Sequence, residues 1–309
     1  MANEILMSVD VDEWYQCRWA TGSDFALWPD TQTFFREYYG SNKPSGEILP
    51  LVERILELFA ENEIRATFFF TGEIASFYPD LVKRVAAEGH EIASHNLVHK
   101  DYHQVALYEF TEHLKKTNGL LEDLSGQAML GYRAPNSAVH PDMIRCLLEL
   151  GLRYDSSVTP TRPFMGKFGE FTKASVNPYP LAEDSFAERG SSGLWEFPLP
   201  VFPWGKLPAG SGIMTRIAGY RYTVTALDRA LETGDTVYYF HPYEIGPRPK
   251  LDGIDLRTRV FLRNLGESYF RSLKRLIERY RGRFVCGCDL LRRLQGSALS
   301  TRPTAHADP

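Results

Sequence analysis

The chain has 309 residues, of which 43% are hydrophobic and 24% are charged, and a chain of this size and composition can bury the core of one large α/β domain. The formal net charge of -4 gives no electrostatic reason to expect nucleic acid or an anionic membrane surface as a partner. The sequence shows no apolar stretch long enough to cross a membrane, and its start, Met-Ala-Asn-Glu, lacks the basic and apolar regions of a signal peptide, so we expect a cytoplasmic protein without a membrane span.

The four cysteines, Cys17, Cys146, Cys286 and Cys288, are sparse for this length and form no Cys-x-x-Cys pair. Neither a disulfide framework nor a cysteine zinc site is therefore indicated. We interpret Cys286-Gly287-Cys288 as a pair of reduced thiols at the end of a strand.

In chain order, short apolar runs alternate with segments of helical periodicity. The run 5–9 predicts a buried strand, and the segment 48–62 has apolar residues at helical spacing. Further strands are predicted at 66–70, 91–94, 129–132, 152–154, 194–197, 236–240 and 284–286, and further helices at 79–88, 107–124, 141–150, 224–232 and 258–280. This alternation implies parallel strands joined by crossover helices, and roughly seven such strands predict a closed or nearly closed barrel.

Two long segments interrupt the alternation. Residues 13–47 are rich in aromatic residues, and residues 156–193 combine prolines with aromatic residues. Loops of this length in a compact domain are usually lids or binding loops. We therefore predict a single α/β barrel domain over 1–296 that carries these two insertions, followed by a flexible tail at 297–309.

Polar residues directly follow several of the predicted strands. In a barrel of parallel strands such positions converge on one rim, where these folds place their chemistry. The residues concerned are Asp10, His95, Arg133, Asp155 and His241.

Two histidines four residues apart, His95 and His99, accompany the pair Asp10-Val11-Asp12. Two imidazoles and one carboxylate form a familiar ligand set for a divalent cation and leave positions open for water or substrate. The second carboxylate would then be free to act as a base. Zinc suits this set best, but Co²⁺, Ni²⁺, Mn²⁺ and Fe²⁺ also fit it, so the sequence leaves the metal open.

The chain resembles the NodB-homology polysaccharide deacetylases between about Leu6 and Leu290. The blocks that carry the resemblance are Ser8-Val9-Asp10-Val11-Asp12, Ser94-His95-Asn96-Leu97-Val98-His99, Gly131-Tyr132-Arg133-Ala134-Pro135, Tyr154-Asp155-Ser156 and Phe240-His241-Pro242. The resemblance implies a distorted (β/α)7 barrel and a metal-dependent deacetylase. A softer likeness, in the residues around His241 and in 207–212, points to the branch linked to exopolysaccharide and surface-glycan synthesis.

The resemblance also implies a role for each site residue. Asp10 would be the general base, oriented by an ion pair with Arg133. His241, supported by Asp155, would be the general acid that protonates the leaving amine. The metal ligands would be Asp12, His95 and His99.

Two departures from the family pattern affect these assignments. Val11 separates the two acids, so the choice between Asp10 and Asp12 as metal ligand stays open. Asn136 stands where an aromatic residue or glycine often follows the Arg-x-Pro block. We assign Pro135 and Asn136, together with Trp14, to substrate binding, although core packing explains Trp14 equally well.

The function that we expect is removal of an N-acetyl group from a sugar, on a nucleotide-linked or lipid-linked precursor of a surface glycan. One alternative is an allantoinase-like hydrolase of a small cyclic amide. Another is a barrel that binds glycan without cleaving it. The sequence discloses neither the substrate sugar nor the oligomeric state.

Overall fold

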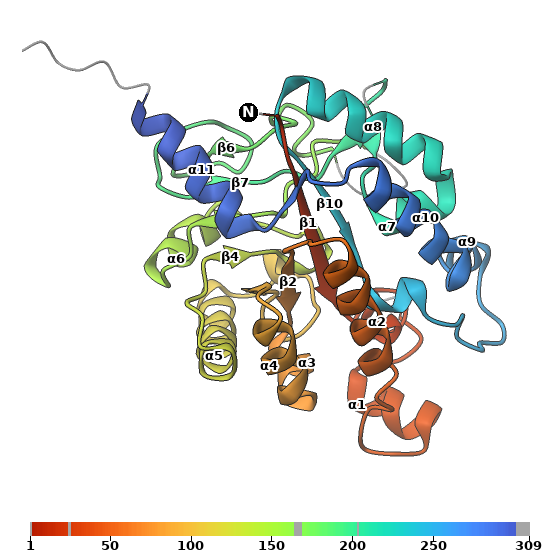
Figure 1. Ribbon diagram of the computed structural model, residues 1–309. Coiled ribbons are helices and arrows are strands. Elements are labelled where there is room, and N and C mark those ends of the chain that lie inside the picture. Colours follow the sequence, from red (N-terminus) through yellow and green to blue (C-terminus); the bar gives the residue numbers. More distant parts are fainter. Residues whose placement is uncertain (1, 24–25, 164–168, 203, 301–309) are drawn as a thin grey trace, which may run out of the picture.

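The computed structural model describes residues 2–23, 26–163, 169–202 and 204–300. Its strands are β1 (Ile5–Val11), β2 (Thr67–Phe70), β3 (Glu91–Ser94), β4 (Gly131–Tyr132), β5 (Tyr154–Asp155), β6 (Tyr179–Pro180), β7 (Trp195–Glu196), β8 (Val201–Phe202), β9 (Leu207–Pro208), β10 (Thr236–Phe240) and β11 (Phe284–Val285). Seven parallel strands form the central sheet in the order β10-β1-β2-β3-β4-β5-β7 (Figure 1). Antiparallel β6 extends the sheet beside β7, and β11 pairs with the start of β1.

Helices connect the strands and surround the sheet (Figure 1). They are α1 (Thr31–Phe34), α2 (Ile48–Glu61), α3 (Gly72–Phe77), α4 (Pro79–Ala87), α5 (Leu107–Ser125), α6 (Met143–Glu149), α7 (Gly212–Ala218), α8 (Tyr220–Thr233), α9 (Leu256–Phe261), α10 (Glu267–Arg279) and α11 (Gly287–Ser300). Short turns of helix include η1 (Trp14–Gln16), η2 (Phe35–Tyr39), η3 (Tyr102–Gln104), η4 (Pro135–Ser137) and η5 (Pro242–Ile245).

The two faces of β1 meet different surroundings. Met7 and Val9 belong to the main apolar cluster, which also contains Val52 of α2. Leu6, on the opposite face, belongs to a second cluster inside the curled sheet. Because side chains alternate along a strand, Asp10 shares the inner face with Leu6. The apolar pattern of β1 therefore turns a buried carboxylate toward the interior of the barrel.

The predicted α/β barrel of parallel strands is confirmed, and β3 and β10 have the predicted bounds. The single helix predicted over 258–280 is wrong, since α9 ends at Phe261 and α10 begins at Glu267. Between them Asn264 and Gly266 have φ angles of 57° and 75°. A continuous right-handed helix cannot contain such left-handed residues.

Helix α11 continues to Ser300, so the first residues of the segment 297–309 are helical, and the flexible tail stays a prediction. The rest of that segment, 301–309, lies outside the described residues. Helices α3 and α7 and the hairpin β8–β9 are further elements that the sequence patterns did not predict.

Much of the predicted aromatic insertion, residues 13–47, packs as a small core of its own. Trp14, Tyr15, Phe34 and Phe35 are buried there against Tyr243 of η5. The insertion is therefore held against the end of β10, beside the candidate site. In the part of the chain that the structure describes, no helix has the length and apolarity needed to cross a membrane.

Candidate active site

Strand register brings the polar residues together at one end of the sheet. Val9 of β1 pairs with Phe240 of β10, so Asp10 and His241 follow on neighbouring strands. On the other side, Ser94 pairs with Tyr132, so that His95 and Arg133 follow in the same way. The predicted convergence on one rim is thus present.

Asp12, His95 and His99 form what we call the histidine cluster. Oδ2 of Asp12 lies 3.7 Å from Nε2 of His95 and 3.2 Å from Nε2 of His99. One ligand atom from each residue lies within 4.8 Å of the others. Asp10 is held elsewhere, so the geometry places Asp12, rather than Asp10, among the histidines.

The donor atoms of this cluster fit a divalent cation. Nδ1 of His95 must carry a proton, because it donates to the carbonyl oxygen of Arg133 at 2.7 Å. Nε2 of His95 is therefore the nitrogen that faces Asp12, and a hydrogen bond from Nδ1 to a carbonyl oxygen is usual for a histidine that binds metal through Nε2. Oδ1 of Asp12 is buried and has no hydrogen-bond partner among the described residues.

The ionisation states of the three side chains depend on one another. Burial by itself raises the pKa of Asp12, but the nearby imidazoles outweigh it and lower that pKa overall. Burial lowers the pKa of His99, whereas at His95 the effect of burial is outweighed, chiefly by Asp12, and the pKa is raised. Two imidazole nitrogens and an ionised carboxylate match the preferences of zinc and its neighbours in the transition series.

Asp10 forms the predicted ion pair with Arg133. Its Oδ1 lies 2.5 Å from Nη1 of Arg133, and both side chains are buried. Arg133 also donates to Oγ of Ser8 at 3.0 Å and to the carbonyl oxygen and Oγ of Ser156 at 2.8 Å and 2.7 Å. The guanidinium group lies over the ring of Phe69. These contacts fix the orientation of the Asp10 carboxylate.

His241 faces Asp10 from the end of β10. Its Nε2 lies 4.0 Å from Oδ2 of Asp10. Its Nδ1 lies 2.9 Å from Oε1 of Glu244, and Oε2 of Glu244 lies 2.6 Å from Nε of the buried Arg216. Burial, the largest single cause, lowers the pKa of His241, but Glu244 together with Asp10 and Asp12 outweighs it, so the net shift is upward. Arg216 and His241 together outweigh the effect of burial on Glu244 and lower the pKa of that carboxyl group.

The expectation that Asp155 supports His241 is wrong, because Glu244 takes that place. The carboxylate of Asp155 instead accepts hydrogen bonds from the backbone N–H and Oγ of Ser157, at 2.9 Å and 2.7 Å. Glu196 is its other neighbour, and burial next to Asp155 raises the pKa of Glu196 far above its usual value. A protonated Glu196 can donate to Asp155, which directly precedes Ser156, the residue whose Oγ accepts from Arg133.

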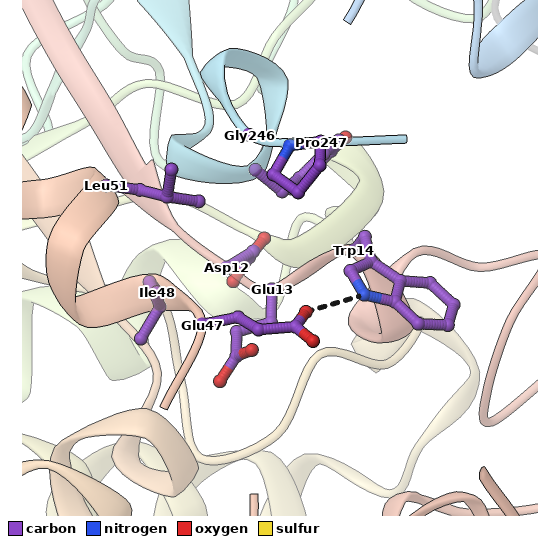
Figure 2. A pocket seen from close by; sticks show the side chains of 9 residues that line it. Asp12, Glu13, Trp14, Glu47, Ile48, Leu51, Gly246 and Pro247 are labelled. Carbon is purple, nitrogen blue, oxygen red and sulfur yellow. Dashed lines mark hydrogen bonds between the residues drawn. The ribbon is translucent and has the colours of Figure 1, made fainter. Parts of the chain in front are cut away.

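A small pocket opens beside Asp12 of the histidine cluster. Asp12 lines it, and Trp14, another lining residue, donates from Nε1 to Oε2 of Glu47 at 3.3 Å (Figure 2). Burial raises the pKa of Glu13, another lining residue, to about 7. The remaining lining side chains come from α2 and from the segment that follows β10: Ile48, Leu51, Tyr243, Gly246 and Pro247.

The other two predicted substrate residues lie apart from this pocket lining. Pro135 is buried at the start of η4. Asn136 has a φ of 57°, and its Nδ2 donates to Asp101 at 2.8 Å. Trp14 is only 5% exposed and stacks on Trp19, so it packs in the aromatic core while its edge borders the pocket. Substrate binding by these three residues stays a prediction.

Sequence reasoning missed Glu244 and Arg216, which hold His241. Glu244 had a local signal, because a residue three positions after a strand-ending histidine lies above it in a single helical turn. Arg216 had none, since α7 reaches η5 only through the tertiary fold.

Comparison with protein families gives two matches. Residues 46–154 match the family model described as polysaccharide deacetylase, and residues 156–285 match a domain of unknown function, DUF3473. His95, His99 and Arg133 fall in the first region, whereas His241 falls in the second. Asp10 and Asp12 precede both regions. The site is therefore assembled from both matched regions and the strand before them.

Two curated proteins illustrate the similarity. A chitooligosaccharide deacetylase of Rhizobium leguminosarum bv. trifolii is 33% identical over 100 residues, which is 32% of this chain and 46% of that protein. A peptidoglycan-N-acetylglucosamine deacetylase of Bacillus cereus is 32% identical over 104 residues, which is 34% of this chain and 38% of that protein. The match spans less than half the length of either relative.

Among solved structures, a Mycobacterium smegmatis protein proposed to be a polysaccharide deacetylase superposes with a TM-score of 0.64 at 18% identity. The superposition covers 99% of this chain and 96% of the other. At this level of identity the similarity establishes a shared fold.

Proposed function

We propose that the chain is a metal-dependent hydrolase that removes an N-acetyl group from a sugar, a proposal supported by the match of residues 46–154 to the polysaccharide deacetylase family model and by the similarity to curated deacetylases. The observation that carries this proposal is the grouping of a cation-type ligand set, a carboxylate and an imidazole at one rim. Amide hydrolysis needs an electrophilic activator, a base and an acid on the leaving nitrogen.

In this proposal Asp12, His95 and His99 hold the cation, most suitably Zn²⁺, with Co²⁺, Ni²⁺, Mn²⁺ or Fe²⁺ as other candidates. When bound, the cation would polarise the amide carbonyl and make a nearby water a stronger nucleophile. The protein fixes the orientation of His95 through the hydrogen bond from its Nδ1 to the carbonyl oxygen of Arg133.

Asp10 is the proposed general base. Arg133 binds Oδ1 of Asp10, which leaves Oδ2 directed toward the side on which His241 lies. A carboxylate oriented in this way can accept the proton of the attacking water. The ion pair with Arg133 holds the carboxylate of Asp10 apart from His95 and His99.

His241 is the proposed general acid. Glu244 binds Nδ1, so Nε2 is the nitrogen that faces Asp10 and the pocket side. A protonated Nε2 can deliver its proton to the leaving amine. The upward shift of the pKa of His241 supports this role, because it keeps the ring protonated at higher pH.

The proposed substrate is an N-acetylated sugar in a nucleotide-linked or lipid-linked precursor of a surface glycan, as in exopolysaccharide synthesis. The small pocket beside Asp12 is lined by the apolar Ile48 and Leu51, the indole of Trp14 and the carboxylate of Glu47. These apolar and polar groups can contact the edge of a sugar at the mouth of the site, because a sugar has both C–H faces and hydroxyl groups. A cytoplasmic location stays a prediction, and cell fractionation tests it.

The test compares two carboxylate variants, Asp10→Asn and Asp12→Asn, by acetate release from N-acetylglucosamine oligomers and by metal content. We expect the wild-type protein to release acetate with a bound cation. Asp10→Asn should keep the cation and lose about 10²- to 10⁴-fold in rate, the usual contribution of a general base. Asp12→Asn should lose both the cation and the activity.

Three outcomes would contradict the proposal. Wild-type protein that binds the cation but releases no acetate from any N-acetylated sugar would indicate a binding barrel. Ureide formation from a cyclic amide without acetate release would indicate an allantoinase-like enzyme. Cation loss in Asp10→Asn rather than in Asp12→Asn would reverse the assigned roles.

A further inference from the structure

A second group of ligand-type side chains lies at the other end of the sheet from the histidine cluster. Glu91 is the first residue of β3, Cys286 directly follows β11, and Cys288 lies in the first turn of α11. One ligand atom from each lies within 4.8 Å of the others, and the two Sγ atoms are 3.3 Å apart. We call these three residues the cysteine cluster.

The carboxyl group of Glu91 is only partly satisfied within the protein. Its Oε2 accepts hydrogen bonds from Oγ1 of Thr67 at 2.6 Å and from the backbone N–H of Cys288 at 3.0 Å. Its Oε1 is buried and accepts no hydrogen bond in the part of the chain that the structure describes, although the hydroxyl group of Tyr154 also lies near the carboxyl group, and burial raises the pKa of Glu91. Glu91 as a whole is 5% exposed. A buried carboxylate oxygen without a donor is costly, so a cation at this position would stabilise it.

Gly287, between the two cysteines, packs closely against residues of β2 and β5. The N–H of Gly287 donates to Oγ1 of Thr67 at 2.8 Å. A Cβ atom on Gly287 would lie 2.3 Å from the hydroxyl oxygen of Tyr154, so only glycine allows this close approach. Cys286 is fully buried, whereas Cys288 is partly exposed. One thiol is therefore held in the interior and the other opens to solvent.

The nearby charges would balance a divalent cation. Asp289 accepts a hydrogen bond from Sγ of Cys286 at 3.2 Å and forms ion pairs with Arg65 and Arg292, at 2.8 Å and 2.6 Å. If both thiols ionise, the negative groups are the two thiolates and the carboxylates of Glu91 and Asp289. The positive groups are one divalent cation and the guanidinium groups of Arg65 and Arg292. These charges sum to zero, so the site would be neutral when filled.

We propose that Glu91, Cys286 and Cys288 form a second metal site, which takes a thiophilic divalent cation such as Zn²⁺ and has a structural role. Two sulfur donors and one carboxylate oxygen are ligands that such cations select over Mg²⁺ or Ca²⁺. Binding replaces the two thiol protons, which leave to solvent, and changes no oxidation state. The two cysteines stay reduced, as expected from the sequence, and the proposal adds that their sulfur atoms serve as ligands.

The structural role follows from the elements that meet there. A cation at this point would join the start of α11 to the start of β3, beside the strand pair β1–β11. Helix α11 lies near the N-terminal end of β1 (Figure 1). In barrels of this type the end opposite the chemistry serves stability. A cation bound to the cysteine cluster should therefore raise the free energy of unfolding. It should not affect acetate release, which takes place at the opposite rim.

The test uses reduced, metal-free, full-length protein titrated with Co²⁺. Cobalt bound to thiolate gives a charge-transfer absorption that cobalt bound to histidine and carboxylate lacks. We expect the wild-type protein to bind two equivalents of Co²⁺ and to show the thiolate charge-transfer band. The double variant Cys286→Ser, Cys288→Ser should lose the band and one equivalent, while His95→Ala should lose the other equivalent and keep the band.

Cys146→Ser is the matched control, because Cys146 is a buried free thiol far from Glu91 in the sequence and on α6. It should keep both equivalents and the band. Glu91→Gln preserves the acceptor for Thr67 and should weaken cobalt binding by about tenfold or more. The absence of a thiolate band in the reduced wild-type protein, or its persistence in the double variant, would overturn the proposal.

A stability measurement in the His95→Ala background tests the structural role. There Zn²⁺ should raise the melting temperature through the cysteine cluster alone. The same addition to the variant that also carries Cys286→Ser should produce no shift. An equal shift in both proteins would overturn the proposed role, whatever the outcome of the acetate assay.

Discussion

Two carboxylates that are separated by a single residue have different surroundings at the end of β1. Asp10 is bound to Arg133, whereas Asp12 lies beside His95 and His99. The sequence left their roles open because Val11 separates them. The geometry distinguishes them, since a guanidinium group and a cation cannot both occupy the same side of one buried carboxylate.

Glu244 offers a test of how His241 is poised. In Glu244→Gln the charge that raises the pKa of His241 is lost, so that pKa should fall. Since a general acid must be protonated, activity would then be lost at lower pH. We expect the alkaline limb of the pH profile of kcat/KM to move to lower pH, measured by acetate release.

Glu232→Gln is the matched control for this variant, because Glu232 forms an exposed ion pair with Arg229 on α8. Its pH profile should equal that of the wild type. An unchanged alkaline limb in Glu244→Gln, in protein shown by circular dichroism to be folded, would exclude Glu244 as the residue that positions and charges His241.

At the scale of single residues, the sequence predicted which side chains converge at the strand ends, but it did not predict all of their hydrogen-bond partners. His95, Arg133 and His241 end up on one rim because strand ends align in a parallel sheet. The support of His241 by Asp155 was wrong because sequence order does not determine which carboxyl group reaches a ring nitrogen. Glu244 does so through a single turn of helix, and Glu196 binds Asp155 instead.

Among the elements, α7 has a packing requirement that links it to the site. A Cβ atom on Gly212, at the start of α7, would lie 2.4 Å from Oε1 of Glu244. Gly212→Ala should therefore displace the carboxylate that holds His241. We expect kcat/KM to fall by about 10²-fold and the free energy of unfolding to fall by about 1–3 kcal/mol.

Gly119 provides the control, because a Cβ atom there would meet open space in the middle of α5. Gly119→Ala should raise the free energy of unfolding by about 0.5–1 kcal/mol and leave kcat/KM unchanged. Chemical denaturation and acetate assays measure both quantities. Equal activities of the Gly212→Ala and Gly119→Ala proteins would contradict the link between α7 and His241.

The elements that the sequence predicted well are those whose pattern is local. The apolar residues of α2 recur at helical spacing, β10 is a short apolar run, and β3 is a short segment bounded by Gly89 and the polar residues that follow Ser94. The break between α9 and α10 was missed because Asn264 interrupts an otherwise continuous helical pattern only through its backbone conformation. The hairpin β8–β9 has strands too short to leave a periodic signal.

For the whole molecule, the strand order explains why the barrel could be predicted and the pocket could not. β1 pairs with β10 on one side and with β2 on the other, so the beginning and the end of the sequence build one rim. The pocket depends on how the segment that follows β1 packs against η5, through the aromatic cluster that contains both Trp14 and Tyr243. The prediction of a single domain over 1–296 remains a prediction.

The central claim is that Asp12, His95 and His99 hold one cation beside Asp10 and His241. An anomalous difference map at the zinc absorption edge, from crystals grown with Zn²⁺, tests it most directly. The account predicts a peak about 2.0–2.2 Å from one oxygen of Asp12 and one nitrogen of each histidine, with Asp10 still bound to Arg133. No peak between these three residues, or a peak ligated by Asp10 in place of Asp12, would contradict it.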